Sequence, residues 1–471
     1  MRGVAALFLG ALVSGATASA APLTLQQTVA YAMTHNATIA AKQAALAQAE
    51  SAFTKQRAAE LPGVVGTLQN VMEKQNNYAG TLAQYGVQPV PNFSQNTAQV
   101  GTQWTVYNGS LNQILTQQYY RAVEAARSDL HQTQAQTTQK LVEMFFAIAN
   151  WRHLYELAQG NLAYQQALLA VAQAKEKAGL VAGVDVLRAE VGVEQTQAAL
   201  LDAQAQELTA GEMLAVKIGT DLDTAFAVPD VLPEPPLPAG SVPALVEIAQ
   251  RSRPDIAIAL AGVAIAQLSR STIDADLLPQ VNVFAAFGNQ TSPTGYVDQQ
   301  NQVTQLNAQC ARYPNSIECI GYPFQNVSRG TPGFWNIGAT STLSLPIVDY
   351  GTRAAEHRSA NANVAAAQLA LDTAKNAAQA DVTESLRGAQ TARQALSYQR
   401  KAADLGLEAA RIARLQYENG IASLTDTKAA QQTSLQVRAD LFNAQIAYID
   451  AVVKLRSALG TFDPAATVAD L

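Results

Sequence analysis

Short motifs recur in the two halves of the sequence, in one order and at matched spacing. Each half carries a Leu-Pro pair followed by three widely spaced glycines: Leu61-Pro62, Gly109, Gly179 and Gly219 in the first, and Leu278-Pro279, Gly351, Gly420 and Gly460 in the second. The intervals between successive glycines differ by no more than one residue between the halves. We therefore interpret the chain as a tandem duplication of one structural unit.

The duplication divides the chain into two repeats, residues 21–227 and 244–462. Residues 228–243 join them as a proline-rich linker that cannot be helical, and 463–471 form a short tail. Each repeat is predicted to contain a helix, two strands separated by a polar loop, a very long helix and a shorter returning helix. The strands are expected at about 62–73 and 99–107 in the first repeat, and at about 279–288 and 334–346 in the second.

The long helices set the fold class. About 65 residues of helix extend roughly 100 Å and need neighbours along their whole length. Only 14% of the residues are charged and 6% are aromatic, so these helices must pack closely through small side chains. We predict a mostly α-helical fold with a small β part, built from duplicated long α-hairpins.

Glycine interrupts each long helical segment at a matched place. In YENGIASLTD, Gly420 breaks the helical pattern at a cost of about 1 kcal/mol relative to alanine. Gly179 is its counterpart, so both are predicted to be hairpin tips. An aspartate follows each glycine by six residues, as Asp185 and Asp426. Each aspartate begins the returning helix, where the helix dipole and capping favour an acid.

The predicted strands alternate between apolar and polar residues. Trp104 and Tyr107 lie near the end of one strand, and Phe334 and Trp335 lie near the start of another. This pattern is typical of a transmembrane β-barrel wall with interfacial aromatic residues, although a soluble sheet with one buried face gives the same alternation. Four strands cannot close a barrel in lipid, so several chains must share one.

The N-terminus predicts export. Residues 1–20 combine a basic start, an apolar stretch and the small residues Ala18 and Ala20, which indicates a signal peptide. Ala21 follows the expected cleavage site, so no lipid attachment is expected there. Cys310 and Cys319 are the only cysteines, and in an exported chain they favour a disulfide over half a zinc site.

Composition and motifs argue against several functions. The formal net charge of −6 offers no basic surface for nucleic acid. The four histidines show no metal-ligand spacing, and no catalytic triad, phosphate loop or dinucleotide fingerprint occurs. We expect no enzymatic activity, metal or cofactor.

The chain resembles the TolC family of outer-membrane efflux channels over essentially its whole mature length. The resemblance is carried by the duplicated plan, the Leu-Pro pairs, Arg253-Pro254-Asp255-Ile256 and Leu459-Gly460-Thr461. It implies a homotrimer in which each chain supplies four strands to a twelve-stranded outer-membrane barrel. The helices would form a periplasmic α-barrel, recruited by an adaptor protein and an inner-membrane pump. Such ducts serve drug, metal and polypeptide exporters alike.

The resemblance also implies a gate at the periplasmic hairpin tips. It assigns gate roles to Asp185, Asp426 and Tyr417, with Tyr417 as a hydrogen-bond partner of Asp185. Three other gate positions depart from the family pattern and carry Val184, Ala422 and Ala429. The first repeat also has Asn36-Ala37 where the family often has Asn-Pro. These changes predict a gate with fewer polar contacts and less negative charge.

A different class of function is a periplasmic coiled-coil scaffold or adaptor subunit without a pore. An adaptor would need a compact β-rich module flanking a single hairpin. Two hairpins together with four barrel-like strands favour the channel.

Overall fold

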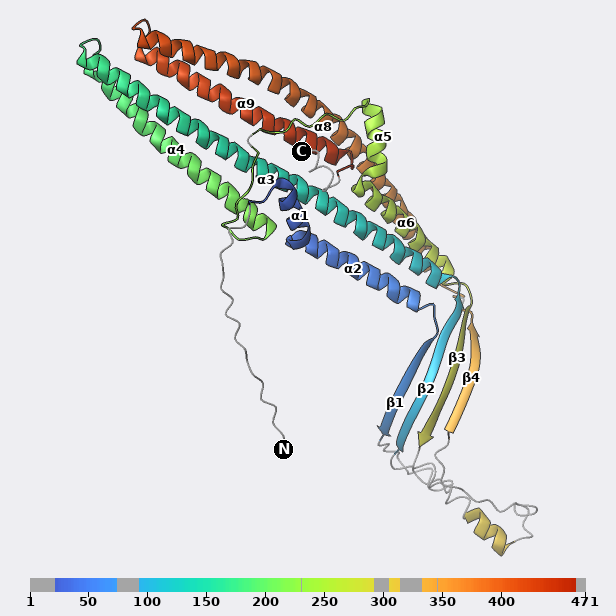
Figure 1. Ribbon diagram of the computed structural model, residues 1–471. Coiled ribbons are helices and arrows are strands. Elements are labelled where there is room, and N and C mark those ends of the chain that lie inside the picture. Colours follow the sequence, from blue (N-terminus) through green and yellow to red (C-terminus); the bar gives the residue numbers. More distant parts are fainter. Residues whose placement is uncertain are drawn as a thin grey trace, which may run out of the picture. The chain divides into compact units, whose positions relative to one another are not determined.

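The structure is a computed structural model that describes residues 22–73, 93–229, 231–291, 305–313, 333–344 and 346–462 (Figure 1). The expected signal peptide and tail lie outside these residues. The first repeat forms α1 (Leu25–His35), α2 (Ala37–Ala58), β1 (Gly63–Glu73), β2 (Phe93–Asn108), α3 (Leu111–Lys177) and α4 (Gly183–Ile218). The second forms α5 (Val242–Ser252), α6 (Pro254–Ala275), β3 (Gln280–Thr291), β4 (Gly333–Thr342), α8 (Thr352–Glu418) and α9 (Leu424–Ala458).

The two repeats match closely in their elements. The very long helices α3 and α8 both contain 67 residues, and α2 and α6 both contain 22. Of the described helices, α6 alone is long and apolar enough to cross a membrane by length and composition. Because α2 has the same length and the same place in its repeat, we interpret α6 as a wall helix like α2.

The chain folds into two compact units, and each repeat contributes to both. One unit comprises Met1–Gln48, Glu124–Gly262 and Ala367–Leu471, and the other comprises Ala49–Val123 and Val263–Ala366. The first therefore holds the hairpin tips, and the second holds the strands.

In the first unit the long helices lie side by side in the order α4, α3, α9, α8 (Figure 1). Phe145 of α3 is buried against Ile218 of α4, while Phe146 of α3 is buried against Ile449 of α9. α8 and α9 share a further buried cluster that includes Val382. Adjacent buried positions on α3 thus face two different helices, which explains why its apolar residues follow no single stripe.

Asn36 and Arg253 hold equivalent positions in the two repeats. Asn36 Nδ2 donates to the carbonyl oxygen of Lys217 at 3.0 Å, and Arg253 Nη1 donates to that of Ala458 at 3.3 Å. Each acceptor lies two residues before a glycine of positive φ, Gly219 or Gly460. Both side chains therefore tie a helix junction to the end of a returning helix.

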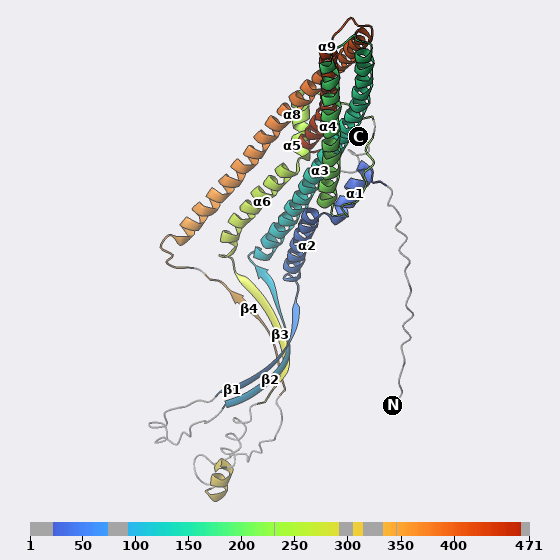
Figure 2. The same ribbon diagram turned by 90° about the vertical axis from the view of Figure 1, so that its left-hand side faces the viewer.

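The second unit contains one antiparallel sheet in the order β1-β2-β3-β4, seen from two sides in Figures 1 and 2. Three strand ends differ from the sequence prediction. β3 ends at Thr291 rather than at about 288, because its last residues still pair with β2 as far as Asn96. β2 begins at Phe93 rather than at about 99, because its polar first residues still pair with β1 as far as Glu73. β4 ends at Thr342 rather than at about 346, because its partner Gln280 is the first residue of β3. Pro279, just before it, has no N–H to extend the ladder.

Candidate functional site

The sheet places most of its large apolar side chains on one face. Directly opposed residues share a face, and the strand registers align Val100, Phe287 and Trp335 in one row. Leu68 belongs to the same face because it lies opposite Ala98, two residues before Val100. The other face is mostly polar and, apart from apolar residues such as Phe284, carries Gln69, Gln99, Gln103, Asn282 and Asn336.

This apolar face is exposed. Leu68 is 88% exposed, Phe287 70% and Trp335 75%. A soluble sheet would bury such a face, whereas a transmembrane barrel presents it to lipid. Of the two interpretations that strand alternation leaves open, exposure favours the barrel wall.

The predicted interface aromatics lie toward opposite ends of the strands. Trp104 and Tyr107 are near the end of β2, and Trp335 is near the start of β4; all three are exposed. Trp104 Nε1 donates to the carbonyl oxygen of Glu60 at 2.8 Å, so its indole has the polar partner that an interfacial position requires. The side chain of Phe334 lies outside the described residues. The membrane-interface role of these residues stays a prediction.

Both predicted tip glycines end their helices in the same way. Gly179 and Gly420 have φ of +73° and +76°, a left-handed conformation that favours glycine. The N–H of the residue after each glycine bonds a carbonyl five residues back, at 2.9 Å for Leu180 and 2.8 Å for Ile421. The glycine N–H bonds a carbonyl three residues back. These are Schellman motifs, which explains why glycine stands at both positions.

The two aspartates bind within their own hairpins. Asp426 lies in the first turn of α9, and its carboxylate accepts from the hydroxyl of Ser423, the N-cap residue, at 2.6 Å. Asp185 lies in the first turn of α4 and pairs with Arg188 at 3.4 Å. This geometry is that of helix N-terminal acids. Asp426 is also exposed, as a residue at a channel mouth would be.

Tyr417 does not make the expected hydrogen bond to Asp185. The tyrosine is 3% exposed, and its hydroxyl has no hydrogen-bond partner among the described residues. Its ring packs with Leu168 and Val186 in a buried cluster between the two hairpins. Burial raises the pKa of the Tyr417 hydroxyl, and the charge of Asp185 raises it further. Tyr417 therefore acts mainly as an apolar packing residue.

Two lysines that sequence reasoning missed connect the hairpins instead. Lys175 of α3 lies 4.1 Å from the centroid of the Tyr417 ring and donates to the Tyr417 carbonyl oxygen. Lys428 of α9 donates to the carbonyl oxygen of Arg188 on α4. One signal was present in the sequence: Gly192, inside α4, leaves the space that Lys428 occupies.

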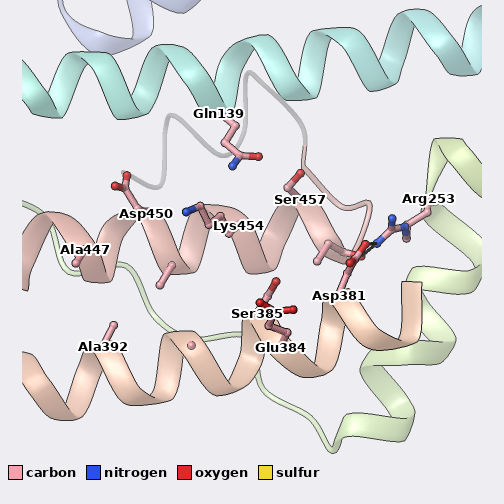
Figure 3. Close-up of a pocket in the computed structure, with 13 residues that line it drawn as sticks. Gln139, Arg253, Asp381, Glu384, Ser385, Ala392, Ala447, Asp450, Lys454 and Ser457 are labelled. Atoms are coloured by element: carbon pink, nitrogen blue, oxygen red, sulfur yellow. Dashed lines mark hydrogen bonds and ion pairs between the residues drawn. The ribbon is translucent and has the colours of Figure 1, made fainter. Parts of the chain in front are cut away.

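Polar residues line a cavity of about 680 Å³ among α3, α8 and α9, away from the tips (Figure 3). At one end Arg253 pairs with Asp255 at 2.7 Å and with Asp381 at 2.9 Å. At the other, one carboxyl oxygen of Asp450 is buried without a hydrogen-bond partner among the described residues. Burial raises the pKa of Asp450 to about 6, with a further contribution from the negative charge of Glu143.

Cys310 lies on a short helix at 305–312 and is buried and disulfide-bonded. Cys319 lies outside the described residues, so its pairing with Cys310 stays a prediction.

The sequence model of the outer membrane efflux protein family matches residues 29–220 and 245–461, which is most of the chain. The chain belongs to this family. The predicted resemblance and the outer-membrane localisation are thereby confirmed. A comparison with curated proteins finds no match.

Solved channel structures share the fold. CmeC of Campylobacter jejuni superposes with a TM-score of 0.72 at 15% identity, covering 95% of this chain and 89% of its own. VceC of Vibrio cholerae gives 0.71 at 17%, covering 93% and 96%. The open state of MtrE of Neisseria gonorrhoeae gives 0.69 at 19%, covering 93% and 88%. The predicted fold class is confirmed.

Proposed function

We propose that three copies of this efflux family member form a passive outer-membrane duct, gated at its periplasmic hairpin tips. A periplasmic adaptor and an inner-membrane pump are its proposed partners. The observation that carries the proposal is the exposed apolar face of the four-stranded sheet, because such a face is stable in lipid. The edge strands β1 and β4 have no further strand partner in the described part of the chain. Lipid does not tolerate open edges, so neighbouring copies must supply partners.

Internal symmetry predicts the register of this seam between copies. β1 pairs with β2 as β3 pairs with β4, with Gly63↔Gln103 corresponding to Gln280↔Thr342. Under that correspondence, the Val100↔Phe287 pair of β2 and β3 becomes Ala339 of one copy opposite Asn70 of the next. Both residues then lie on the apolar face, as a continuous barrel requires.

The turns beside the strands support the same seam. An added methyl at Gly109 would meet the Ala275 carbonyl oxygen at 2.3 Å and Leu278 Cβ at 2.7 Å, so this turn packs against the end of α6. Among the described residues, nothing lies within 4 Å of a methyl added at its counterpart, Gly351. Leu61, the counterpart of Leu278, is 67% exposed. We infer that Leu61 of the next copy covers Gly351.

The test is extraction of the full-length protein from membranes, followed by electrophoresis with and without heating. The proposal predicts a membrane-fraction protein that migrates as an oligomer in detergent until it is heated. A soluble periplasmic protein without a detergent-stable oligomer would instead support the scaffold or adaptor alternative.

A further inference from the structure

The hairpin tips of one chain are joined through two lysines that reach in opposite directions. Lys175 extends from the first hairpin to Tyr417 of the second, and Lys428 extends from the second hairpin to Arg188 of the first. Both acceptors are backbone carbonyl oxygens. The hydrogen bonds therefore depend on the position of the neighbouring helix.

The Lys175 contact is favoured in two ways. Its ammonium lies 4.1 Å from the centroid of the Tyr417 ring, within cation–π range. The carbonyl that it binds is in the last turn of α8 and also accepts from the Gly420 N–H at 3.0 Å. A cation beside a helix C-terminus interacts favourably with the helix dipole.

The Lys428 contact depends on a glycine. A methyl at Gly192 would lie 2.7 Å from Lys428 Nζ and 2.9 Å from Gln165 Oε1. Gln165 is 7% exposed, and its Oε1 has no hydrogen-bond partner among the described residues. Gly192 thus leaves the space that the Lys428 ammonium needs to reach Arg188.

We propose that Lys175 and Lys428 are the clasps that hold the two hairpin tips of each chain together, and that gate opening must break them. This inference rests on the proposed duct function. It assigns the locking role to cations, at tips where the described partners of the acids Asp185 and Asp426 lie within their own hairpins.

The first test removes the two ammonium groups. Lys175→Met with Lys428→Met keeps the aliphatic stems, and the purified full-length protein is inserted into planar lipid bilayers. Loss of the cation–π contact alone should raise the open-to-closed ratio roughly threefold. Lys177→Met, an exposed lysine of the same turn, is the matched control and should behave as wild type. Lys175→Arg, made as a single substitution, keeps a cation and a hydrogen-bond donor and should keep the open-to-closed ratio near that of wild type.

The second test keeps both lysines. Gly192→Ala should displace Lys428 and raise the open-to-closed ratio, although alanine is the better helix former. Gly211→Ala, in the same helix, places its methyl more than 4 Å from every described side chain and should leave the ratio unchanged. Equal gating by these two alanine variants would contradict the Lys428 clasp.

The outcomes separate this inference from the duct itself. If the wild type conducts and the double lysine variant has the same open-to-closed ratio, the locking role of the two lysines is wrong, while the proposed duct function is unaffected. If neither wild type nor variants form pores, the proposed function fails, and the clasps fail with it.

Discussion

Asp450 shows how a single carboxyl group couples the helical wall to pH. It lies on α9, facing Glu143 and Lys140 of α3 and Lys454 of its own helix. Burial and Glu143 together raise its pKa to about 6, from an ordinary value of 3.8. The folded state therefore favours the neutral form of the Asp450 carboxyl group, and ionising it there destabilises the fold. As pH rises from about 4 through 6, the unfolded chain ionises more readily, and folding stability falls.

Asp450→Asn should consequently stabilise the protein at pH 7.5, and the gain should fade toward pH 4. A rise of the Asp450 pKa from 3.8 to about 6, discounted for the partial exposure of the group, corresponds to about 1–2 kcal/mol of folding stability per chain. Thermal unfolding followed by circular dichroism across this pH range measures it. Asp404→Asn removes the same charge from an exposed position on α8 and serves as the control. A gain independent of pH would contradict the assignment.

At the scale of elements, the two returning helices differ in their N-caps. The Ser423 hydroxyl accepts from the backbone N–H of Asp426 at 3.1 Å, while Ala182 gives α4 no side-chain cap. The turn that precedes each N-cap is a Schellman motif in both hairpins, so the caps are what differ between the tips. The second hairpin tip is therefore better anchored than the first.

Exchanging these caps should change tip stability in opposite directions. Ser423→Ala should cost about 1 kcal/mol at the second tip, and Ala182→Ser should gain a similar amount at the first. The hydrogen-exchange rates of peptides spanning 176–186 and 417–427 measure the local stability of each tip, and the unchanged tip serves as an internal control. Matching changes at both tips would show that the caps do not act locally.

The element plan was predictable from sequence because glycine and proline mark its boundaries. Gly179 and Gly420 predicted the turns, since both need a left-handed backbone. The ends of β2 and β4 were not predictable, because pairing with a partner strand decides them. Gly192 was the one sequence signal for the Lys428 contact, and the Lys175 contact had none, because only the packing of two hairpins brings Lys175 and Tyr417 together. The predicted hydrogen bond between Asp185 and Tyr417 was wrong, because Tyr417 is buried among apolar side chains.

At the scale of the whole molecule, one chain is an incomplete barrel wall. Its sheet exposes an apolar face and ends in two unpaired edges within the described residues, and the repeat symmetry specifies how the edges of two copies meet. The exposed Leu61 and the open space at Gly351 fit the same junction. The central claim is therefore that copies of this chain close a barrel through β1 and β4.

Cysteine cross-linking tests this claim most directly. Asn70→Cys combined with Ala339→Cys should give covalent dimers and trimers in outer membranes after oxidation, because directly opposed residues have Cβ atoms roughly 5 Å apart. Gln69→Cys with Ala339→Cys, which places the thiols on opposite faces, should cross-link weakly. Monomers only from the first pair, or equal cross-linking from both pairs, would contradict the predicted seam.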